Sequence, residues 1–152
     1  DAAAGTVTVS SNVTTSGAFE TAGYAGVNLD GEIYSSGATA IASKAGDVVI
    51  GGAIETPSTI DISAGAGVQI DGALHSGSSL TVAAQQDVAL NSSVEVDGTG
   101  NASVNAGRDL SGSGTLSVAN DTVLVAGRNL SLAGAIQTGN DLNASATEDL
   151  TL

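Results

Sequence analysis

The chain has 152 residues, enough for one domain with a sizeable core, and its composition already excludes several classes of protein. Three basic residues stand against 16 acidic ones, so the formal net charge is −13 and too few cations are present to bind nucleic-acid phosphates or an anionic membrane surface. The absence of cysteine excludes disulfides and thiolate zinc sites. Only Phe19, Tyr24 and Tyr34 are aromatic, so we expect a thin, regular, aliphatic core.

No apolar run approaches the roughly 20 residues of a membrane-spanning helix, so we expect no insertion into a membrane. The first residue is aspartate rather than methionine, and no signal peptide is visible. We therefore expect residues 1–152 to be one structural segment cut from a longer array, without separate capping elements.

The first predicted element of each repeat is a short strand. A branched aliphatic residue marks this strand, and we call that residue the anchor. The anchors recur at intervals of 20, 21, 20, 20, 22, 20 and 20 residues, at Val7, Val27, Val48, Val68, Val88, Leu110, Leu130 and Leu150. A second aliphatic residue stands two positions after each anchor, and Gly112 is the one exception, which we interpret as a bulge or a narrow section. A fixed period near 20 residues is typical of a solenoid.

Two further strands are predicted in each repeat. The second strand is marked six residues after the anchor, at Val13, Ile33, Ile54, Leu74, Val94, Leu116 and Ile136. The third has residues two apart, at Ile60 and Ile62, Leu80 and Val82, Ala102 and Val104, Thr122 and Leu124, and Leu142 and Ala144. In the first two repeats, Phe19 and Ile41 are expected to fill this place, with small insertions in the turns of both. Alternation at every second position predicts strands rather than helices.

Three short strands per repeat are too short to fold alone as a meander, but they stack in parallel when the chain winds as a coil. The sequence therefore predicts an all-β fold, a parallel β-helix (β-solenoid) of triangular cross-section with about seven coils of ~20 residues. Right-handed winding is expected because parallel crossovers favour that hand. Seven intervals at the inter-strand spacing of about 4.8 Å predict a rod about 34 Å long.

The repeats resemble a known family in three segments, AGRDL at 106–110, AGRNLSL at 126–132 and AGDVVI at 45–50. These are similar to the repeats of filamentous haemagglutinin-like exoproteins of bacterial two-partner secretion, which include adhesins and contact-dependent inhibition effectors. The resemblance implies a right-handed shaft that an outer-membrane transporter exports to the bacterial cell surface or the medium. Because the chain has no Arg-Gly-Asp triplet and no recognisable toxin portion, no binding site of the family is transferred to it.

Acidic and amide side chains recur at two places in the repeat and are the first candidate sites. They precede anchors by one residue at Asp47, Asp87, Asp109, Asn129 and Asp149, and by nine residues at Asn101, Asp121 and Asp141. Stacked carboxylates about 4.8 Å apart repel, so we expect Arg108 and Arg128 to compensate the column of Asp87, Asp109 and Asn129. The simplest interpretation is that Asp and Asn occupy turns, where they tolerate left-handed backbone and bond locally.

The alternative interpretation of the same columns is that they bind a divalent cation such as calcium. The candidate ligands are Asp121, Asp141, Asp87 and Asp109. No other metal ligand and no cofactor-binding residue is predicted.

Catalysis is not expected, and no catalytic residue is predicted. Two acid pairs share a strand face, Glu95 with Asp97 and Asp30 with Glu32, but neither pair is expected to have a basic or aromatic neighbour. His75, the only histidine, is expected to point outward into solvent. Tyr24 and Tyr34 are the only candidates for an exposed aromatic spot that contacts sugar.

The function predicted from these observations is structural: a shaft segment of a large secreted adhesin that extends a distal binding or effector region. Its partners are then the neighbouring coils, the outer-membrane transporter and an unidentified surface receptor. End-to-end association of two copies is also expected, because the two ends of a parallel solenoid are complementary. The alternatives are a cation-dependent self-association or biofilm-matrix module and a fragment of a carbohydrate-active β-helix enzyme.

Overall fold

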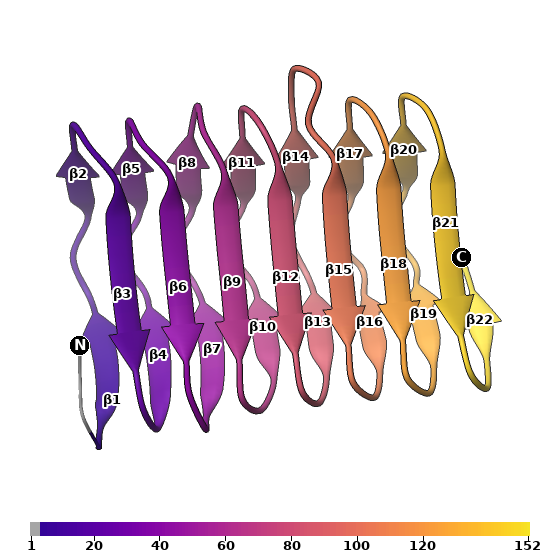
Figure 1. The fold of residues 1–152 in the computed structure, drawn as a ribbon, viewed down its shortest axis with the longest axis horizontal. Coiled ribbons are helices and arrows are strands. Elements are labelled where there is room, and N and C mark those ends of the chain that lie inside the picture. The colour runs from indigo at the N-terminus through magenta and orange to yellow at the C-terminus, as the bar shows by residue number, and fades with distance from the viewer. Residues whose placement is uncertain (1–3) are drawn as a thin grey trace.

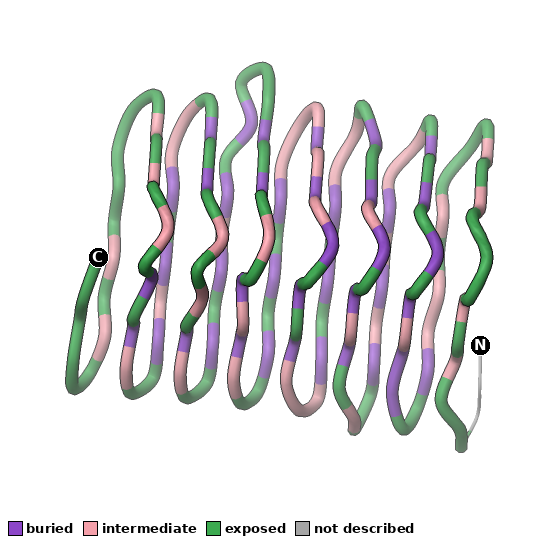
Figure 2. The backbone as a smooth tube through the Cα atoms, turned by 180° about the vertical axis from the view of Figure 1, so that it is seen from behind, coloured by how far each residue is buried: buried purple, intermediate pink, exposed green. Residues whose placement is uncertain are grey.

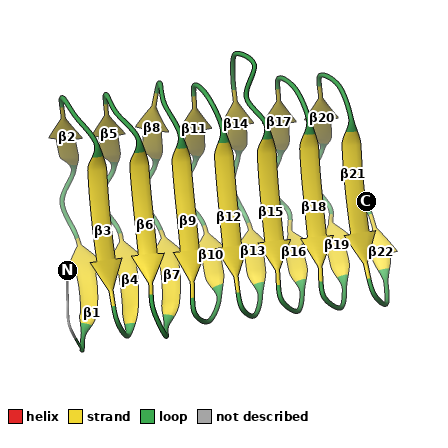
Figure 3. Ribbon diagram, viewed as in Figure 1, coloured by secondary structure: helices red, strands yellow, loops and turns green. Residues whose placement is uncertain are grey.

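The computed structural model describes residues 4–152, in which the chain forms strands and turns and no helix (Figure 3). This part of the chain therefore has no helix long and apolar enough to cross a membrane. Three parallel sheets run the length of the molecule, and each coil contributes one strand to each of them. The sheets are named first, second and third, in the order in which the chain visits them.

The first sheet holds the strands that the anchors mark. Its eight strands within residues 4–152 are β1 (Thr6–Val9), β4 (Gly26–Leu29), β7 (Asp47–Ile50), β10 (Val68–Ile70), β13 (Val88–Leu90), β16 (Leu110–Gly112), β19 (Leu130–Leu132) and β22 (Leu150–Thr151). The second sheet consists of β2 (Val13–Thr15), β5 (Ile33–Ser35), β8 (Ile54–Thr56), β11 (Leu74–Ser76), β14 (Val94–Val96), β17 (Leu116–Val118) and β20 (Ile136–Thr138). The third sheet consists of β3 (Phe19–Gly23), β6 (Thr39–Ser43), β9 (Ile60–Ala64), β12 (Leu80–Ala84), β15 (Ala102–Ala106), β18 (Thr122–Ala126) and β21 (Leu142–Ala146).

The winding is right-handed, as predicted. In Figure 1 the coils advance from left to right, the strands of the third sheet run downward in front, and the strands behind them run upward. A chain that descends in front and rises behind while it moves to the right turns in the right-handed sense. The sequence-based prediction of a right-handed parallel β-helix with three strands per coil is therefore confirmed.

The predicted register of the anchors is also confirmed. Each anchor pairs with the next along the whole first sheet, from Val7 with Val27 to Leu130 with Leu150. Both predicted inward residues of the early third sheet take such places: Phe19 pairs with Thr39, and Ile41 pairs with Ile62. Parallel, in-register stacking thus reproduces the 20-residue period of the sequence as a spatial repeat.

Two turns are longer than the rest, and one predicted insertion is absent. Four residues separate Ser43 from the anchor Val48, against three between the matching residues Ala64 and Val68, which accounts for the 21-residue interval. The 22-residue interval comes from the turn between β14 and β15, which has five residues, 97–101, where the turn between β11 and β12 has three. The expectation of an insertion in the first repeat is wrong, because its turns match those of later coils in register.

The core is a stack of aliphatic side chains inside the three sheets. Buried and exposed residues alternate along the strands, and the middle coils are the most buried (Figure 2). Ile70, Leu80 and Val94 are at most 2% exposed. Gly112 keeps its place in register between Leu90 and Leu132, and a Cβ there would lie 1.9 Å from the carbonyl oxygen of Leu90. The strand therefore continues through Gly112 without a bulge, and the backbone of the preceding coil leaves no room for a side chain there.

Candidate functional site

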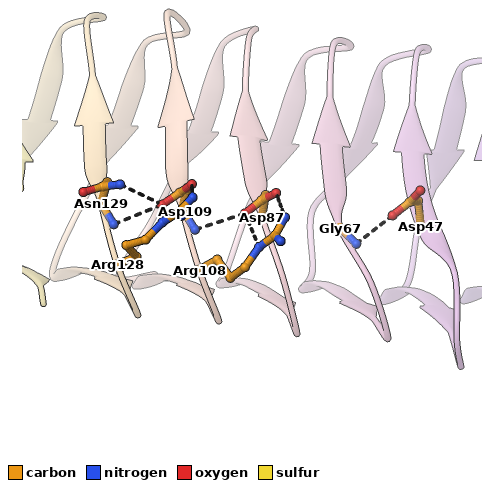
Figure 4. Close-up of polar contacts among 7 residues, drawn as sticks. All are labelled: Asp47, Gly67, Asp87, Arg108, Asp109, Arg128 and Asn129. Carbon is orange, nitrogen blue, oxygen red and sulfur yellow. Dashed lines mark hydrogen bonds and ion pairs between the residues drawn. The ribbon is translucent and has the colours of Figure 1, made fainter. Parts of the chain in front are cut away.

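A column of acidic and amide side chains lies at the corner between the third and first sheets (Figure 4). The Oδ1 atom of Asp47 accepts a hydrogen bond of 2.7 Å from the backbone N–H of Gly67 in the next coil. Asp109 accepts one of 3.2 Å from Asn129 in the same way, and Asp87 accepts one of 3.2 Å from Asp109. Each side chain therefore satisfies a backbone donor that the bend at the corner leaves without a carbonyl partner.

Two arginines compensate the charges of Asp87 and Asp109 in this column, as predicted. The Nε atom of Arg108 lies 3.1 Å from Oδ1 of Asp87, and its Nη2 atom contacts Oδ2 of the same carboxylate. Arg128 holds Asp109 in the same two-point manner, with an Nε–Oδ1 distance of 2.8 Å. In both pairs the arginine lies one coil after its aspartate, so the ion pairs join adjacent coils. Because these side chains are 28–52% exposed, each pair is expected to add at most about 1 kcal/mol of stability.

The arginines also shift the titration of the column. The Arg128 guanidinium, helped by the backbone N–H of Asn129, lowers the pKa of Asp109 to about 2 against a smaller opposing effect of desolvation. The hydrogen bond from Arg108 likewise holds the pKa of Asp87 below its usual range. The same contacts raise the pKa of both guanidinium groups, so the pairs remain charged at neutral pH.

We expect Asp109→Asn to lower the melting temperature at neutral pH, because Arg128 loses its charged partner. A depressed pKa means that ionised Asp109 contributes stability above the usual aspartate pKa of about 4 and loses it as the pH falls to about 2. The gap in melting temperature between wild type and variant should therefore narrow over this range, as measured by circular dichroism. Asp61→Asn, on the outer face of β9, is the matched control, and a gap for Asp109→Asn that stays constant from pH 5 to 2 would contradict the prediction.

A second column lies at the corner between the second and third sheets. Asn101 Oδ1 accepts hydrogen bonds from the backbone N–H of Asp121 at 3.1 Å and from the side-chain amide of Asn120 at 2.8 Å. Asp121 Oδ1 accepts the equivalent bonds from Asp141, at 3.2 Å, and from Asn140, at 2.7 Å. This column therefore uses neutral amides where the first uses arginine.

The expected reason for Asp and Asn at the corners is wrong, although their position is right. Within residues 4–152, no residue other than glycine has a positive φ, so these side chains do not mark left-handed backbone. Their oxygens bind the N–H groups of the next coil, about 20 residues away, rather than local ones.

The four candidate calcium ligands do not converge on one point. Asp87 and Asp109 each face an arginine, whereas Asp121 and Asp141 belong to the other corner. Within the described part of the chain, no three His, Asp or Glu side chains are grouped so that they could hold a metal ion. Calcium binding stays a prediction.

His75 lies on the outer face of the second sheet, as expected, but it is not isolated. It stands in register between Glu55 and Glu95, and its Nε2 atom lies 2.9 Å from Oδ2 of Asp97. The hydrogen bond to Asp97 is the main cause that raises the pKa of His75, and partial desolvation opposes it. The expectation that Glu95 and Asp97 lack a basic neighbour is therefore wrong. The sequence could have predicted that His75 lies beside Glu95, because both residues stand seven positions after an anchor and therefore stack in adjacent coils.

The two tyrosines do not form one aromatic spot. Tyr24 lies in the turn between β3 and β4, with Nζ of Lys44 5.4 Å from the centre of its ring. Tyr34 lies on β5, and its hydroxyl is 3.4 Å from Oε2 of Glu32, whose charge raises the pKa of Tyr34. The expectation that the pair of Asp30 and Glu32 has no aromatic neighbour is therefore wrong. Figure 1 places the turn between β3 and β4 at the lower edge of the molecule and β5 near the upper edge.

An open hollow of about 490 Å³ lies along the ends of four third-sheet strands, from β6 to β15. Small and uncharged polar side chains line it, among them Ser63, Gln85 and Asn105, together with Lys44. The two acidic columns and His75 are not among its lining residues. The hollow therefore brings none of the sequence-predicted site residues together.

No family model, curated protein or solved structure matches the chain. The resemblance to filamentous haemagglutinin-like repeats stays a prediction.

Proposed function

We propose that the chain is a structural shaft segment of a large bacterial exoprotein of the filamentous haemagglutinin type. One observation supports this above all: the three parallel sheets keep one register through every coil from β1 to β22. Each coil adds one strand to each sheet and so about 4.8 Å to the rod, without a change in cross-section. Such a segment extends a distal binding or effector region away from the cell surface.

The contacts between coils suit this role. Hydrogen bonds, stacked aliphatic side chains and the Asp–Arg pairs all join residues about 20 positions apart, so each coil is stabilised by its neighbours. A chain with such contacts can fold coil by coil as it emerges from an outer-membrane transporter. We therefore propose export to the bacterial surface or the medium, and the transporter as a partner.

The sheet edges at opposite ends of the described coils also fit each other. β1, β2 and β3 present one edge of the three parallel sheets, and β22, β20 and β21 present the other. Leu142 and Leu150 at the second edge are 41% and 47% exposed. Coil-on-coil stacking, with further coils or with a second copy, is the partner interaction that this geometry supports.

A chain of doubled length tests the shaft function. It consists of residues 1–152, a second copy of residues 133–147, and then residues 5–152, so that the second Val7 follows Leu150 at a 20-residue interval. We expect the longest dimension, measured by small-angle X-ray scattering, to rise by about 38 Å for eight added intervals, with an unchanged cross-section. The same fusion with the 15 joint residues replaced by glycine and serine is the control, because it lacks the aliphatic residues of a coil, and it should scatter as two rods that are not in line.

Two outcomes would contradict the shaft function. A doubled chain no longer than the single one would mean that the coils do not extend a continuous rod. A single chain whose mass and length grow in millimolar calcium would favour the cation-dependent self-association module instead. Growth with protein concentration alone, without calcium, is the behaviour that the complementary sheet edges predict.

A further inference from the structure

The turn of residues 97–101 is the largest interruption of the regular rod. It joins β14 to β15 and rises above the neighbouring turns in Figure 1. The N–H of Gly100 donates to the carbonyl oxygen of Asp97 at 3.1 Å, which closes a four-residue turn. Gly98, at the second position, has a φ of +67°, a conformation that glycine adopts without strain. The added residues therefore form a defined protrusion at the corner between the second and third sheets.

This turn is attached to the preceding coil differently from its shorter counterpart. In the turn after β11, Gly77 and Ser78 donate backbone hydrogen bonds to Thr56, at 2.8 Å, and Ser58, at 3.2 Å. In the longer turn, Asp97 donates the equivalent of the first bond to Ser76 at 2.9 Å. Its side chain then adds the contact to His75 of the preceding coil. In the longer turn, the side-chain contact between His75 and Asp97 thus replaces the second backbone hydrogen bond that the shorter turn makes to the preceding coil.

The surroundings of His75 make this contact sensitive to protonation. Glu55 on β8 and Glu95 on β14 flank the imidazole in register, and Asp97 contacts it directly. All three carboxylates favour the protonated ring, with the hydrogen bond to Asp97 as the main cause of the raised pKa. When the ring is neutral, the Asp97 carboxylate lies close to other negative charges on this face without a compensating cation.

We propose that His75 and Asp97 form a proton-controlled clasp that orders the 97–101 turn against the rod. Protonated His75 donates a charged hydrogen bond to Asp97 and holds the turn to the preceding coil. Because the pKa of His75 is raised, the clasp is complete below the usual histidine pKa and weakens as the pH rises through the raised value. The turn then becomes mobile, while the register of the coils stays intact.

The only histidine and a threonine inside the turn make this testable by NMR. The imidazole signals of His75 report protonation, and the methyl order parameter of Thr99 reports mobility without interference from amide exchange. Between about pH 5.5 and about pH 8.5 we expect the Thr99 order parameter to fall with the same midpoint as the His75 titration. Far-UV circular dichroism over the same range should stay constant.

Variants separate the clasp from general electrostatics. Asp97→Asn should move the His75 pKa toward its usual value and leave Thr99 mobile at both pH values, and His75→Gln should abolish the pH dependence of Thr99. Glu95→Gln, which removes a flanking charge but no hydrogen bond, should leave the turn ordered at low pH. The proposal is overturned if Thr99 mobility does not change with pH in the wild type. It is equally overturned if Asp97→Asn leaves both the titration and the mobility as they were.

Discussion

Removal of residues 106–125 is expected to leave a folded rod that is one coil shorter. Ala106 and Ala126 occupy the same place in adjacent coils, so Asn105 joined to Ala126 continues the third sheet without a shift. In the shortened protein, Arg128 occupies the position of Arg108 and can pair with Asp87. Leu132 occupies the position of Gly112 and stacks on Leu90. We expect a strand spectrum and a cooperative melting transition close to those of the full chain.

Removal of residues 106–115 is the matched control, because it removes half a coil rather than a whole one. The chain then passes from β15 directly into β17, without the first-sheet strand β16 and the turns on either side of it. The strands after the deletion therefore follow a coil that lacks one of its three strands, and they cannot stack on their counterparts in register. This protein should fail to show a cooperative transition by circular dichroism. Equal stability of the two deletions would mean that the coils are not the folding units of the chain.

Val94→Asp is expected to unfold the chain or destabilise it severely. Val94 is 2% exposed and stacks between Leu74 and Leu116 in the second sheet. A carboxylate at this place has no partner, and an unpaired buried charge costs several kcal/mol, a large part of the roughly 5–15 kcal/mol that stabilises a typical domain. Urea denaturation followed by circular dichroism measures the loss.

Glu95→Lys is the control for this change, because Glu95 is adjacent but points outward. The substitution alters an exposed side chain, for which changes within about 0.5 kcal/mol are usual. Comparable damage from both substitutions would show that the inward and outward faces of β14 are assigned the wrong way round.

The fold could be predicted from the sequence because in-register stacking turns one spatial relation into one sequence interval. The anchors and the residues six positions after them predicted the strands of the first and second sheets directly. Phe19 and Ile41 correctly marked the first two strands of the third sheet, although the pattern there is weaker. Irregular turns were harder. An extra residue in a turn lengthens the interval between two anchors but leaves the order of the aliphatic residues unchanged, so the sequence does not show which turn holds it. An insertion was therefore expected in the first repeat, where none exists.

Side-chain contacts at the corners could be predicted only in part. Arg108 and Arg128 were assigned correctly because like charges in a stack require compensation, and this follows from composition and register alone. The contact of His75 with Asp97 depends on the path of an inserted turn, which the repeat does not specify. The true role of the corner Asp and Asn residues depends on backbone angles, and residue types alone do not determine these.

Inward hydroxyl groups at the end of the second sheet were also missed. Ser35, Thr56 and Ser76 are at most 5% exposed, yet each hydroxyl lies within 2.9 Å of a backbone carbonyl oxygen in a neighbouring turn. The strand pattern places them inside, but only the position of the turn carbonyls explains how a polar group is satisfied there.

The direction of the hydrogen bonds between coils determines how the rod responds to tension. In each sheet these bonds run from strand to strand and therefore lie along the axis of the rod. A pulling force applied through the chain ends detaches an outermost coil first, because that coil contacts only one neighbour, while the coils beneath it keep all their contacts. Coils then detach one after another, and each frees roughly 70 Å of extended chain from about 20 residues. A rod built in this way is expected to lengthen in steps under load and to shorten again as coils restack, so it limits the force that it transmits.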